Sequence, residues 1–276
     1  MAREHEIAAH RSTADDIHWT NPCPGARVAC ADWLDMARAL DPGSVDLVYA
    51  DPPFNTGETK RGAAGSYEDR WTTIGSYVEW LRERISATLP ALKPTGSVLL
   101  HVDWRVSHHA RLLLDELMGP ESFVNHLIWS YGLGGSSPRR FARKHDDILF
   151  YGVEPERYYF DAPRVPATSA RMAGMSKKST DVLAIPSINN MARERVGYPT
   201  QKPLALLDVL VRACCPPGGV TLDPCCGSGT TLVAAIRSGR EAWGADASEG
   251  AVAITLDRLR SAMSGEPASP PTASAR

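Results

Sequence analysis

The chain has 276 residues, of which 43% are hydrophobic and 22% are charged, and its formal net charge is −2. This balance is that of an ordinary globular chain, and it excludes a chain that is basic throughout. No apolar run approaches the roughly 20 residues that span a bilayer, and Met1–Asp16 lacks the apolar core of a secretory signal. We therefore expect a cytoplasmic protein without a membrane segment.

Short apolar runs alternate with longer amphipathic stretches, the pattern of a parallel sheet covered by helices. Seven strands are predicted, at Arg27–Cys30, Asp46–Ala50, Ser97–His101, Phe123–Trp129, Ile148–Tyr151, Val220–Leu222 and Ala242–Ala245. Helices are predicted between them, at Trp33–Leu40, Tyr77–Leu92, Arg105–Met118, Pro203–Cys214, Thr230–Ser238 and Ala247–Met263. The fold class is therefore α/β, with a seven-stranded, mostly parallel sheet and helices on both faces.

Three further segments lack a sustained period. Asn55–Gly75 and Glu154–Pro199 are expected to be irregular, and Ser264–Arg276 is a Pro, Ala and Ser tail that we expect to be disordered. The four residues Lys93–Gly96 are expected to end the helix Tyr77–Leu92 and to turn the chain into the next strand. Because long irregular segments inside a domain usually carry function or move, the first two are candidates for binding surfaces.

One motif lies at Val220–Thr231, where an apolar strand ends in Asp223 and Gly227-Ser228-Gly229 turn into a helix. Glycine at such a turn lets the backbone approach a ligand that a Cβ atom would block. Nucleotide cofactors bind at these strand ends in open α/β sheets. A second strand ends at Asp246, whose carboxylate can accept hydrogen bonds from both hydroxyls of a ribose.

The absence of two phosphate-binding patterns narrows the choice of cofactor. There is no Gly-Lys-Ser/Thr for a triphosphate, and the spacing is not that of the Gly-x-Gly-x-x-Gly cradle for a pyrophosphate. S-adenosylmethionine contains ribose and adenine but no phosphate, and a short glycine turn suits its methionine end. The sequence therefore favours S-adenosylmethionine as the cofactor.

A second motif, Asp46–Asn55, is a buried strand that delivers Asp51-Pro52-Pro53-Phe54 at its carboxyl end. The exocyclic amine of a base is a poor nucleophile, because its lone pair is delocalised into the ring. The Asp51 carboxylate and the Pro52 carbonyl can each accept one N–H and pull the nitrogen toward sp³ geometry, and the rigid prolines set the direction of that carbonyl. Phe54 can stack on a base that has left the duplex.

In this order, the two motifs resemble the amino-methyltransferases of DNA, in the beta class, where the catalytic motif precedes the cofactor motif. The resemblance extends from about Arg27 to Arg260. Tyr198–Pro203 is similar to a His-Pro-Thr-Gln-Lys-Pro segment of that family, with Tyr198 in place of histidine. Ala29–Asp32 is similar to the Gly-Asp end of a strand, with Ala31 in place of glycine, and Cys225 stands where the family usually has phenylalanine, so packing near the cofactor is expected to differ.

The resemblance implies a circularly permuted, Rossmann-like methyltransferase fold and assigns the site residues. The catalytic residues would be Asp51, Pro52, Pro53 and Phe54. The cofactor residues would be Asp32, Asp51, Thr200, Lys202, Asp223, Pro224, Cys225, Gly227, Ser228, Gly229, Thr230, Thr231 and Asp246. For Lys202, contact with the cofactor carboxylate, contact with DNA and a role only in opening the following helix stay open.

The resemblance also implies a division of the chain into segments and a set of partners. Residues 1–26 would be an extension, 27–153 and 198–263 the catalytic domain, 154–197 a target-recognition segment, and 264–276 the tail. The partners implied are duplex DNA, a second copy of the chain as in many dimeric relatives, and a cognate restriction endonuclease. This would place the protein at the nucleoid of the cytoplasm.

Positive charge is concentrated between Arg139 and Lys202, where twelve Lys and Arg face seven Asp and Glu. A basic surface on a nearly neutral protein suits phosphate binding, although a solvated loop with scattered charge is the alternative. The expected DNA contacts are Arg139, Arg140, Arg143, Lys144, His145, Lys177 and Lys178. For His145, a structural hydrogen bond is the alternative.

No metal site is expected. The six cysteines include two adjacent pairs, Cys214–Cys215 and Cys225–Cys226, without a recurring Cys-x-x-Cys spacing, so buried free thiols are the simpler interpretation. The pair His108–His109 and the dipeptide His145-Asp146 lack a third ligand nearby. Cys23 follows a proline, as does the nucleophile of cytosine C5 methyltransferases, but no strand is predicted before it, and its order relative to the cofactor motif is wrong for that family.

Three other functions use related motifs or the same fold. Transfer to N4 of cytosine uses the same geometry, but its usual signature is Ser-Pro-Pro, so Asp51 favours N6 of adenine. Enzymes that methylate RNA or protein glutamine carry an Asn-Pro-Pro tetrapeptide after the cofactor motif, the opposite order. A catalytically inactive DNA-binding subunit would have lost one motif, and both are intact here.

Overall fold

The computed structural model describes residues 17–62, 65–132, 137–166, 174–189 and 192–264, and nine strands of these ranges form one sheet. The order across the sheet is β1 (Trp19–Thr20), β2 (Ala26–Cys30), β13 (Glu241–Asp246), β12 (Val220–Asp223), β3 (Val45–Ala50), β6 (Leu92–Val102), β8 (His145–Gly152), β7 (Phe123–Ser130) and β11 (Val182–Ala184). The five strands from β2 to β6 are mutually parallel, whereas β8 is antiparallel to both of its neighbours.

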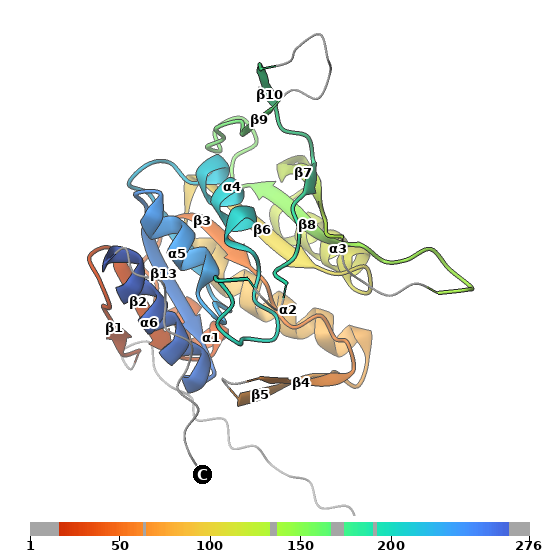
Figure 1. Ribbon diagram of the computed structural model, residues 1–276, viewed down its shortest axis with the longest axis horizontal. Coiled ribbons are helices and arrows are strands. Elements are labelled where there is room, and N and C mark those ends of the chain that lie inside the picture. The colour runs from red at the N-terminus through yellow and green to blue at the C-terminus, as the bar shows by residue number, and fades with distance from the viewer. Residues whose placement is uncertain (1–16, 63–64, 133–136, 167–173, 190–191, 265–276) are drawn as a thin grey trace, which may run out of the picture.

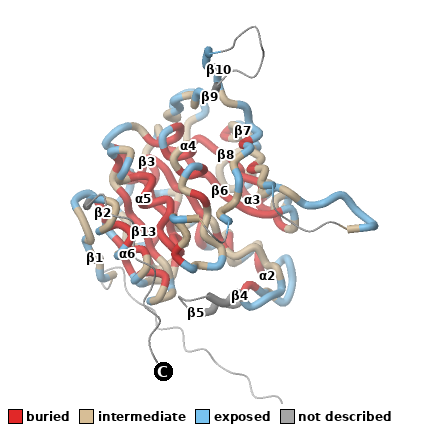
Figure 2. The backbone as a smooth tube through the Cα atoms, in the orientation of Figure 1, coloured by how far each residue is buried: buried red, intermediate tan, exposed pale blue. Residues whose placement is uncertain are grey.

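Helices cover both faces of this sheet, as predicted (Figure 1). The helices α1 (Trp33–Arg38), α2 (Ile74–Thr88) and α3 (Ser107–Met118) pack in one core, and α4 (Leu204–Cys214), α5 (Thr230–Arg237) and α6 (Glu249–Ser264) in the other. The central strand β3 is buried along its whole length: Val48 and Ala50 face the first core, Leu47 and Tyr49 the second. Figure 2 shows this buried centre in red. Within the described ranges, no helix is long and apolar enough to cross a membrane.

All seven predicted strands are present in the central sheet, but this sheet has nine strands among the described residues, two more than predicted. The additional strands β1 and β11 have two and three residues, too short to show an alternating pattern. Strand β11 lies inside the segment 154–197 and pairs with β7, so part of the predicted recognition segment belongs to the central sheet.

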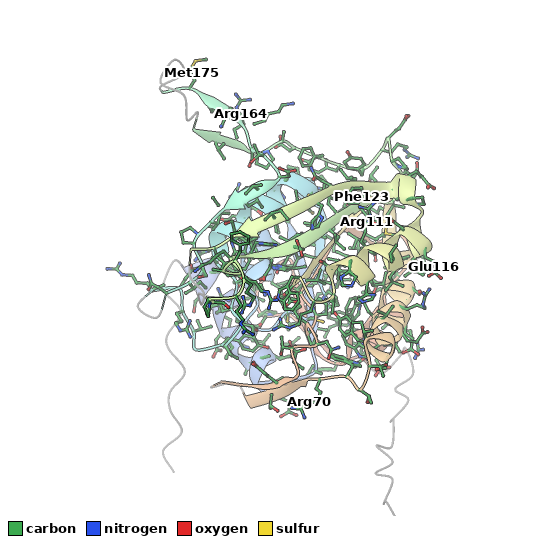
Figure 3. All side chains as sticks on the ribbon, turned by 90° about the vertical axis from the view of Figure 1, so that its right-hand side faces the viewer. Arg70, Arg111, Glu116, Phe123, Arg164 and Met175 are labelled. Atoms are coloured by element: carbon green, nitrogen blue, oxygen red, sulfur yellow. The ribbon has the colours of Figure 1, made fainter. Side chains whose placement is uncertain are left out.

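Two of the segments predicted to be irregular contain hairpins. Asn55–Gly75 holds the antiparallel pair β4 (Glu58–Gly62) and β5 (Gly65–Asp69), and Glu154–Pro199 holds the pair β9 (Arg164–Pro166) and β10 (Ser176–Lys178). Figure 3 shows Arg164 and Met175 on the second hairpin, which projects from the body of the molecule. The segments Met1–Asp16 and 265–276 lie outside the described residues.

The helix predicted to reach Leu92 ends four residues earlier, and a 3₁₀ turn at Leu89–Ala91 follows. Pro90 is the reason, because proline has no N–H to donate to the carbonyl four residues earlier, so the α-helical hydrogen bonds cannot continue through it. The residues Lys93–Gly96 are not a turn but part of strand β6, which already pairs with β3 at Leu92. Helix α2 begins three residues before its predicted start, and every other helix end lies within two residues of the predicted one.

Candidate cofactor and catalytic site

The turn after β12 is built on two glycines with positive φ angles, 52° at Gly227 and 74° at Gly229. A Cβ atom on Gly229 would lie 2.7 Å from the side chain of Thr255, and one on Gly227 would lie 2.9 Å from the ring of Tyr198. Both the backbone conformation and the close neighbours therefore require glycine at these positions. The turn delivers the chain into α5, which begins at Thr230.

Asp246, at the end of β13, is fixed by the same turn. Its Oδ2 atom accepts the N–H of Gly227 at 2.9 Å, and its Oδ1 atom accepts the N–H of Ser248 at 2.9 Å. Burial raises the pKa of this carboxyl above its ordinary value. Each oxygen retains a free lone pair, so the carboxylate can still accept hydrogen bonds from two hydroxyl groups.

Arg258 also stabilises the glycine turn, and this role was not predicted from the sequence. Its Nη1 atom donates to the Ser228 carbonyl at 2.6 Å and to Thr230 Oγ1 at 2.9 Å. Burial lowers the pKa of Arg258 to about 10. The signal was available, because Arg258 falls on the buried face of α6 together with Ala251 and Thr255.

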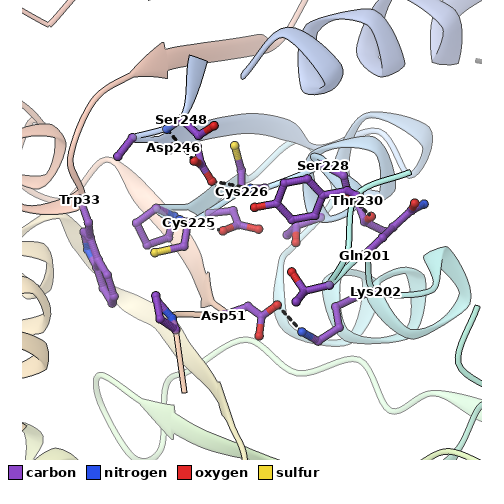
Figure 4. A pocket seen from close by; sticks show the side chains of 18 of the residues that line it. Trp33, Asp51, Gln201, Lys202, Cys225, Cys226, Ser228, Thr230, Asp246 and Ser248 are labelled. Atoms are coloured by element: carbon purple, nitrogen blue, oxygen red, sulfur yellow. Dashed lines mark hydrogen bonds and ion pairs between the residues drawn. The ribbon is translucent and has the colours of Figure 1, made fainter. Parts of the chain in front are cut away.

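A cavity of about 410 Å³ opens between this turn, the end of β3 and the segment Tyr198–Lys202 (Figure 4). Twelve of the thirteen predicted cofactor residues line it: Asp32, Asp51, Thr200, Lys202, Asp223, Pro224, Cys225, Gly227, Ser228, Thr230, Thr231 and Asp246. The thirteenth, Gly229, does not line it and instead packs against Thr255. Tyr198, Pro199 and Gln201, from the segment Tyr198–Pro203 that the resemblance singled out, also line the cavity. Six further lining residues were not predicted: Trp33, Tyr49, Trp80, Cys226, Ala247 and Ser248.

Two of these unpredicted residues, Trp33 and Trp80, form an aromatic wall, with ring centroids 6.2 Å apart. The guanidinium of Arg84 lies 4.3 Å from the Trp80 ring centroid and pairs with Asp32 at 2.9 Å. Asp32 also accepts the N–H of Leu34 and so caps α1. Aromatic rings beside a carboxylate suit a ligand that combines a flat base with a sugar.

The tetrapeptide Asp51–Phe54 follows β3 directly. Asp51 and Pro53 line the cavity, whereas Pro52 and Phe54 do not. The ring of Phe54 stacks on His101, with centroids 5.9 Å apart. His101 is fully buried, and its nitrogens lie 2.7 Å from Tyr49 Oη and 3.3 Å from Asp146 Oδ2. This support beneath Phe54 was not predicted from the sequence.

The carboxyl groups at this end of the cavity interact with one another. Burial raises the pKa of Asp223 to about 7, and the negative charges of Asp51 and Asp246 act in the same direction. Lys202 supplies an opposing charge, because its Nζ atom pairs with Asp51 Oδ2 (Figure 4).

The predicted DNA contacts lie outside the cavity. Arg139, Arg140 and Arg143 are exposed on the connection between β7 and β8, with Lys144 and His145 at its end, and Lys177 and Lys178 lie in β10. Figure 1 shows that this connection and the β9–β10 hairpin extend from the body in different directions. Among the described residues, no group of three or more His, Cys, Asp or Glu is arranged to hold a metal ion.

An α/β sheet with a glycine turn and a second acidic strand end beside one cavity defines an enzyme that binds a nucleoside-containing cofactor. The chain belongs to the N6/N4 family of DNA methylases, whose model matches residues 45–257. It is therefore an enzyme that methylates DNA, and the cofactor of this family is S-adenosylmethionine.

Two curated relatives cover most of the chain. The type II methyltransferase M.ScaI of Streptomyces caespitosus is 28% identical over 250 residues, which are 83% of this chain and 79% of the relative. The DNA adenine methyltransferase YhdJ of Escherichia coli is 28% identical over 244 residues, 83% of this chain and 80% of the relative.

Among solved structures, the cytosine-N4-specific PvuII DNA methyltransferase is similar with a TM-score of 0.66 and 16% identity, over 85% of this chain and 86% of that one. At this identity, the similarity supports the shared fold.

Proposed function

We propose that this protein transfers the methyl group of S-adenosylmethionine to N6 of adenine in duplex DNA, with Asp51 as the acceptor for the target amine. One observation carries the proposal: the Asp51 carboxylate lines the same cavity as the glycine turn and Asp246. A cofactor held by the turn and a base held at Asp51 would thus meet in the same cavity.

The residues of the cavity fit the cofactor. Asp246 has acceptor capacity for the ribose hydroxyls, and the volume of about 410 Å³ is within the range of small-ligand sites. The carboxyls Asp51, Asp223 and Asp246 suit a ligand with a positively charged sulfur. When bound, the cofactor supplies an electrophilic methyl group.

The chemistry assigned to the chain is activation of a weak nucleophile. The target amine would take the methyl group that the cofactor supplies, and the proton that the nitrogen then loses would pass by way of the Asp51 carboxylate to solvent. Asp51 and the Pro52 carbonyl would accept the two N–H groups and so favour the tetrahedral nitrogen of the transition state. The base must leave the duplex to reach this cavity, and unstacking costs a few kcal/mol.

Adenine is favoured because residue 51 is aspartate rather than serine, and a relative named a DNA adenine methyltransferase covers most of the chain. Cytosine N4 is the second candidate, because the same fold is found in a cytosine-N4-specific enzyme. A recognition role for residues 154–197, a homodimer, a cognate endonuclease and a nucleoid location belong to the same proposal. Membership of the beta class stays a prediction from the motif order.

The target base can be identified directly. DNA from a host that expresses the protein is digested to nucleosides and analysed by mass spectrometry, and modification-sensitive sequencing gives the site. We expect N6-methyladenine in one short sequence context, and none in a host that expresses Asp51→Ala. Detection of N4-methylcytosine instead would contradict the choice of adenine.

A further inference from the structure

Lys202 contacts the acceptor carboxylate. It lies one residue before Pro203, which caps α4, and its Nζ atom pairs with Oδ2 of Asp51, which is 151 residues away in the chain. The side chains of Lys202 and Asp51 are 12% and 17% exposed, so the pair is largely withdrawn from water (Figure 4). An ion pair in this setting has little screening from solvent, and loss of one partner leaves the other charge uncompensated.

The second oxygen of the same carboxylate has a different environment. Asp51 Oδ1 is buried and has no hydrogen-bond partner among the described residues. A buried acceptor without a donor is costly unless a ligand satisfies it. The two oxygens of Asp51 are thus unequal: a cation engages one, and the other can accept an N–H.

The segment that carries Lys202 is itself anchored. The Gln201 side chain accepts the N–H of Val196 at 2.9 Å and donates to the Glu194 carbonyl at 2.6 Å. The Glu194 carboxylate accepts the N–H of Leu204 at 3.1 Å. Because residues on both sides of Lys202 are held, the backbone from which its side chain reaches Asp51 is anchored.

The surrounding charges explain why a cation is needed. The negative charges of Asp51 and Asp246 both act on Asp223, so three carboxyl groups share this end of the cavity. Lys202 also acts on Asp146, beside His101. Without Lys202, a buried carboxylate at Asp51 would face neighbouring acids with no compensating partner.

We propose that Lys202 is a positioning residue for methyl transfer: it orients the Asp51 carboxylate through Oδ2, and so leaves Oδ1 as the acceptor for the target amine. This role differs from contact with the cofactor carboxylate, and it rests on the proposed function of Asp51.

The test compares Lys202→Met, which removes the charge, with Lys202→Arg, which keeps it. Methyl transfer is measured in a single turnover at saturating S-adenosylmethionine and duplex DNA, and cofactor affinity is measured by calorimetry. Lys202→Met should slow the single turnover by at least about tenfold and change cofactor affinity by less than about threefold, as expected for an effect on the transition state. Lys202→Arg should recover most of the rate.

A second readout needs neither cofactor nor DNA. Unfolding by denaturant of the wild type, Lys202→Met, Asp51→Asn and the double variant forms a double-mutant cycle. Loss of Lys202 should lower the folding equilibrium constant at least about threefold more in the presence of Asp51 than in its absence.

Lys93→Met is the matched control. Lys93 also pairs with a buried aspartate, Asp46, at 2.7 Å, but neither residue lines the cavity. This variant should lower stability and leave the single-turnover rate unchanged.

Three results would overturn the inference: a normal rate in Lys202→Met, a loss confined to cofactor affinity, or no coupling in the cycle. If the wild type transfers no methyl group to any DNA, the proposed function fails, whereas the cycle still reports on the ion pair.

Discussion

Asp223 ends strand β12, where its side chain is buried and accepts the N–H of Cys225 at 3.1 Å. Burial raises its pKa from 3.8 to about 7, so at neutral pH the carboxyl is divided between its two forms. The cofactor brings a positively charged sulfur into the same cavity, and its binding should therefore favour the ionised form.

We expect the affinity for S-adenosylmethionine to increase about tenfold between pH 6 and pH 8, because a proton must leave Asp223 below pH 7. Calorimetry on the wild type and on Asp223→Asn measures this. The difference between the two proteins isolates Asp223, since ionisation of the cofactor's own amino group is common to both. Equal pH dependence in both proteins would contradict the assignment.

The raised pKa of Asp223 also affects the stability of the cofactor-free protein. Between about pH 4 and pH 7 the folded state binds the Asp223 proton more tightly than the unfolded state does. The contribution of Asp223 to the free energy of unfolding should therefore decrease as pH rises through this window and be constant above it. The free energy of unfolding of the wild type, measured relative to that of Asp223→Asn, should accordingly decrease as pH rises through this window, and a constant difference would contradict the assignment.

At the scale of single elements, the strands of the catalytic core were predictable because each is an apolar run with turn residues at its ends. The β4–β5 hairpin was not, because Glu58–Gly62 and Gly65–Asp69 are polar strands without alternation. The two-residue strand β1 and the three-residue strand β11 are defined by pairing with a neighbour, which is not a local property of the sequence.

The residues of the candidate site likewise fall into those that were predicted from the sequence and those that were not. Residues in contiguous motifs, such as Asp51 and Asp223, were predicted to lie at the cavity, and the structure brings them there. Trp80 and His101 were missed because their relation to the site depends on how α2 and β6 pack against β3, which no local pattern encodes. Arg258 carried a weak signal as a charged residue on an apolar helix face, but its partner could not be deduced from sequence.

The connection between β7 and β8 is the element expected to contact DNA phosphates. Arg139 and Arg140 are exposed there, and the Arg143 guanidinium lies 3.4 Å from the ring centroid of Trp104. Arg140→Glu should weaken binding to all duplex sequences alike, because phosphate contacts position the protein without specifying a base. It should also reduce the slope of log affinity against log salt by about 1.

Fluorescence anisotropy with labelled duplexes at several salt concentrations provides this measurement. Arg260→Glu is the control, since Arg260 is an exposed arginine on α6 outside the predicted DNA contacts. An equal effect of the two reversals would mean that only overall charge matters. An unchanged salt slope in Arg140→Glu would indicate that the loop is merely solvated.

At the scale of the whole molecule, the fold brings together three segments that lie far apart in the chain. Strand β3 supplies Asp51, β12 and β13 supply Asp223 and Asp246, and the segment before α4 supplies Lys202. These strands are adjacent and parallel in the order β13-β12-β3, so their carboxyl ends meet at one edge. The topology of the sheet thus assembles the site from segments that are far apart in the chain.

Single-turnover methyl transfer by Asp51→Ala tests the central claim most directly. The cofactor and duplex are saturating, so the rate reports on the chemical step rather than on binding. We predict a loss of at least about 10²-fold, with S-adenosylmethionine and DNA affinities largely retained. Phe54→Ala should be partly rescued by a mismatch opposite the target, which lowers the cost of unpairing, and Asp51→Ala should not. A near wild-type single-turnover rate in Asp51→Ala would contradict the account and leave the Asp-Pro-Pro-Phe segment with a structural role only.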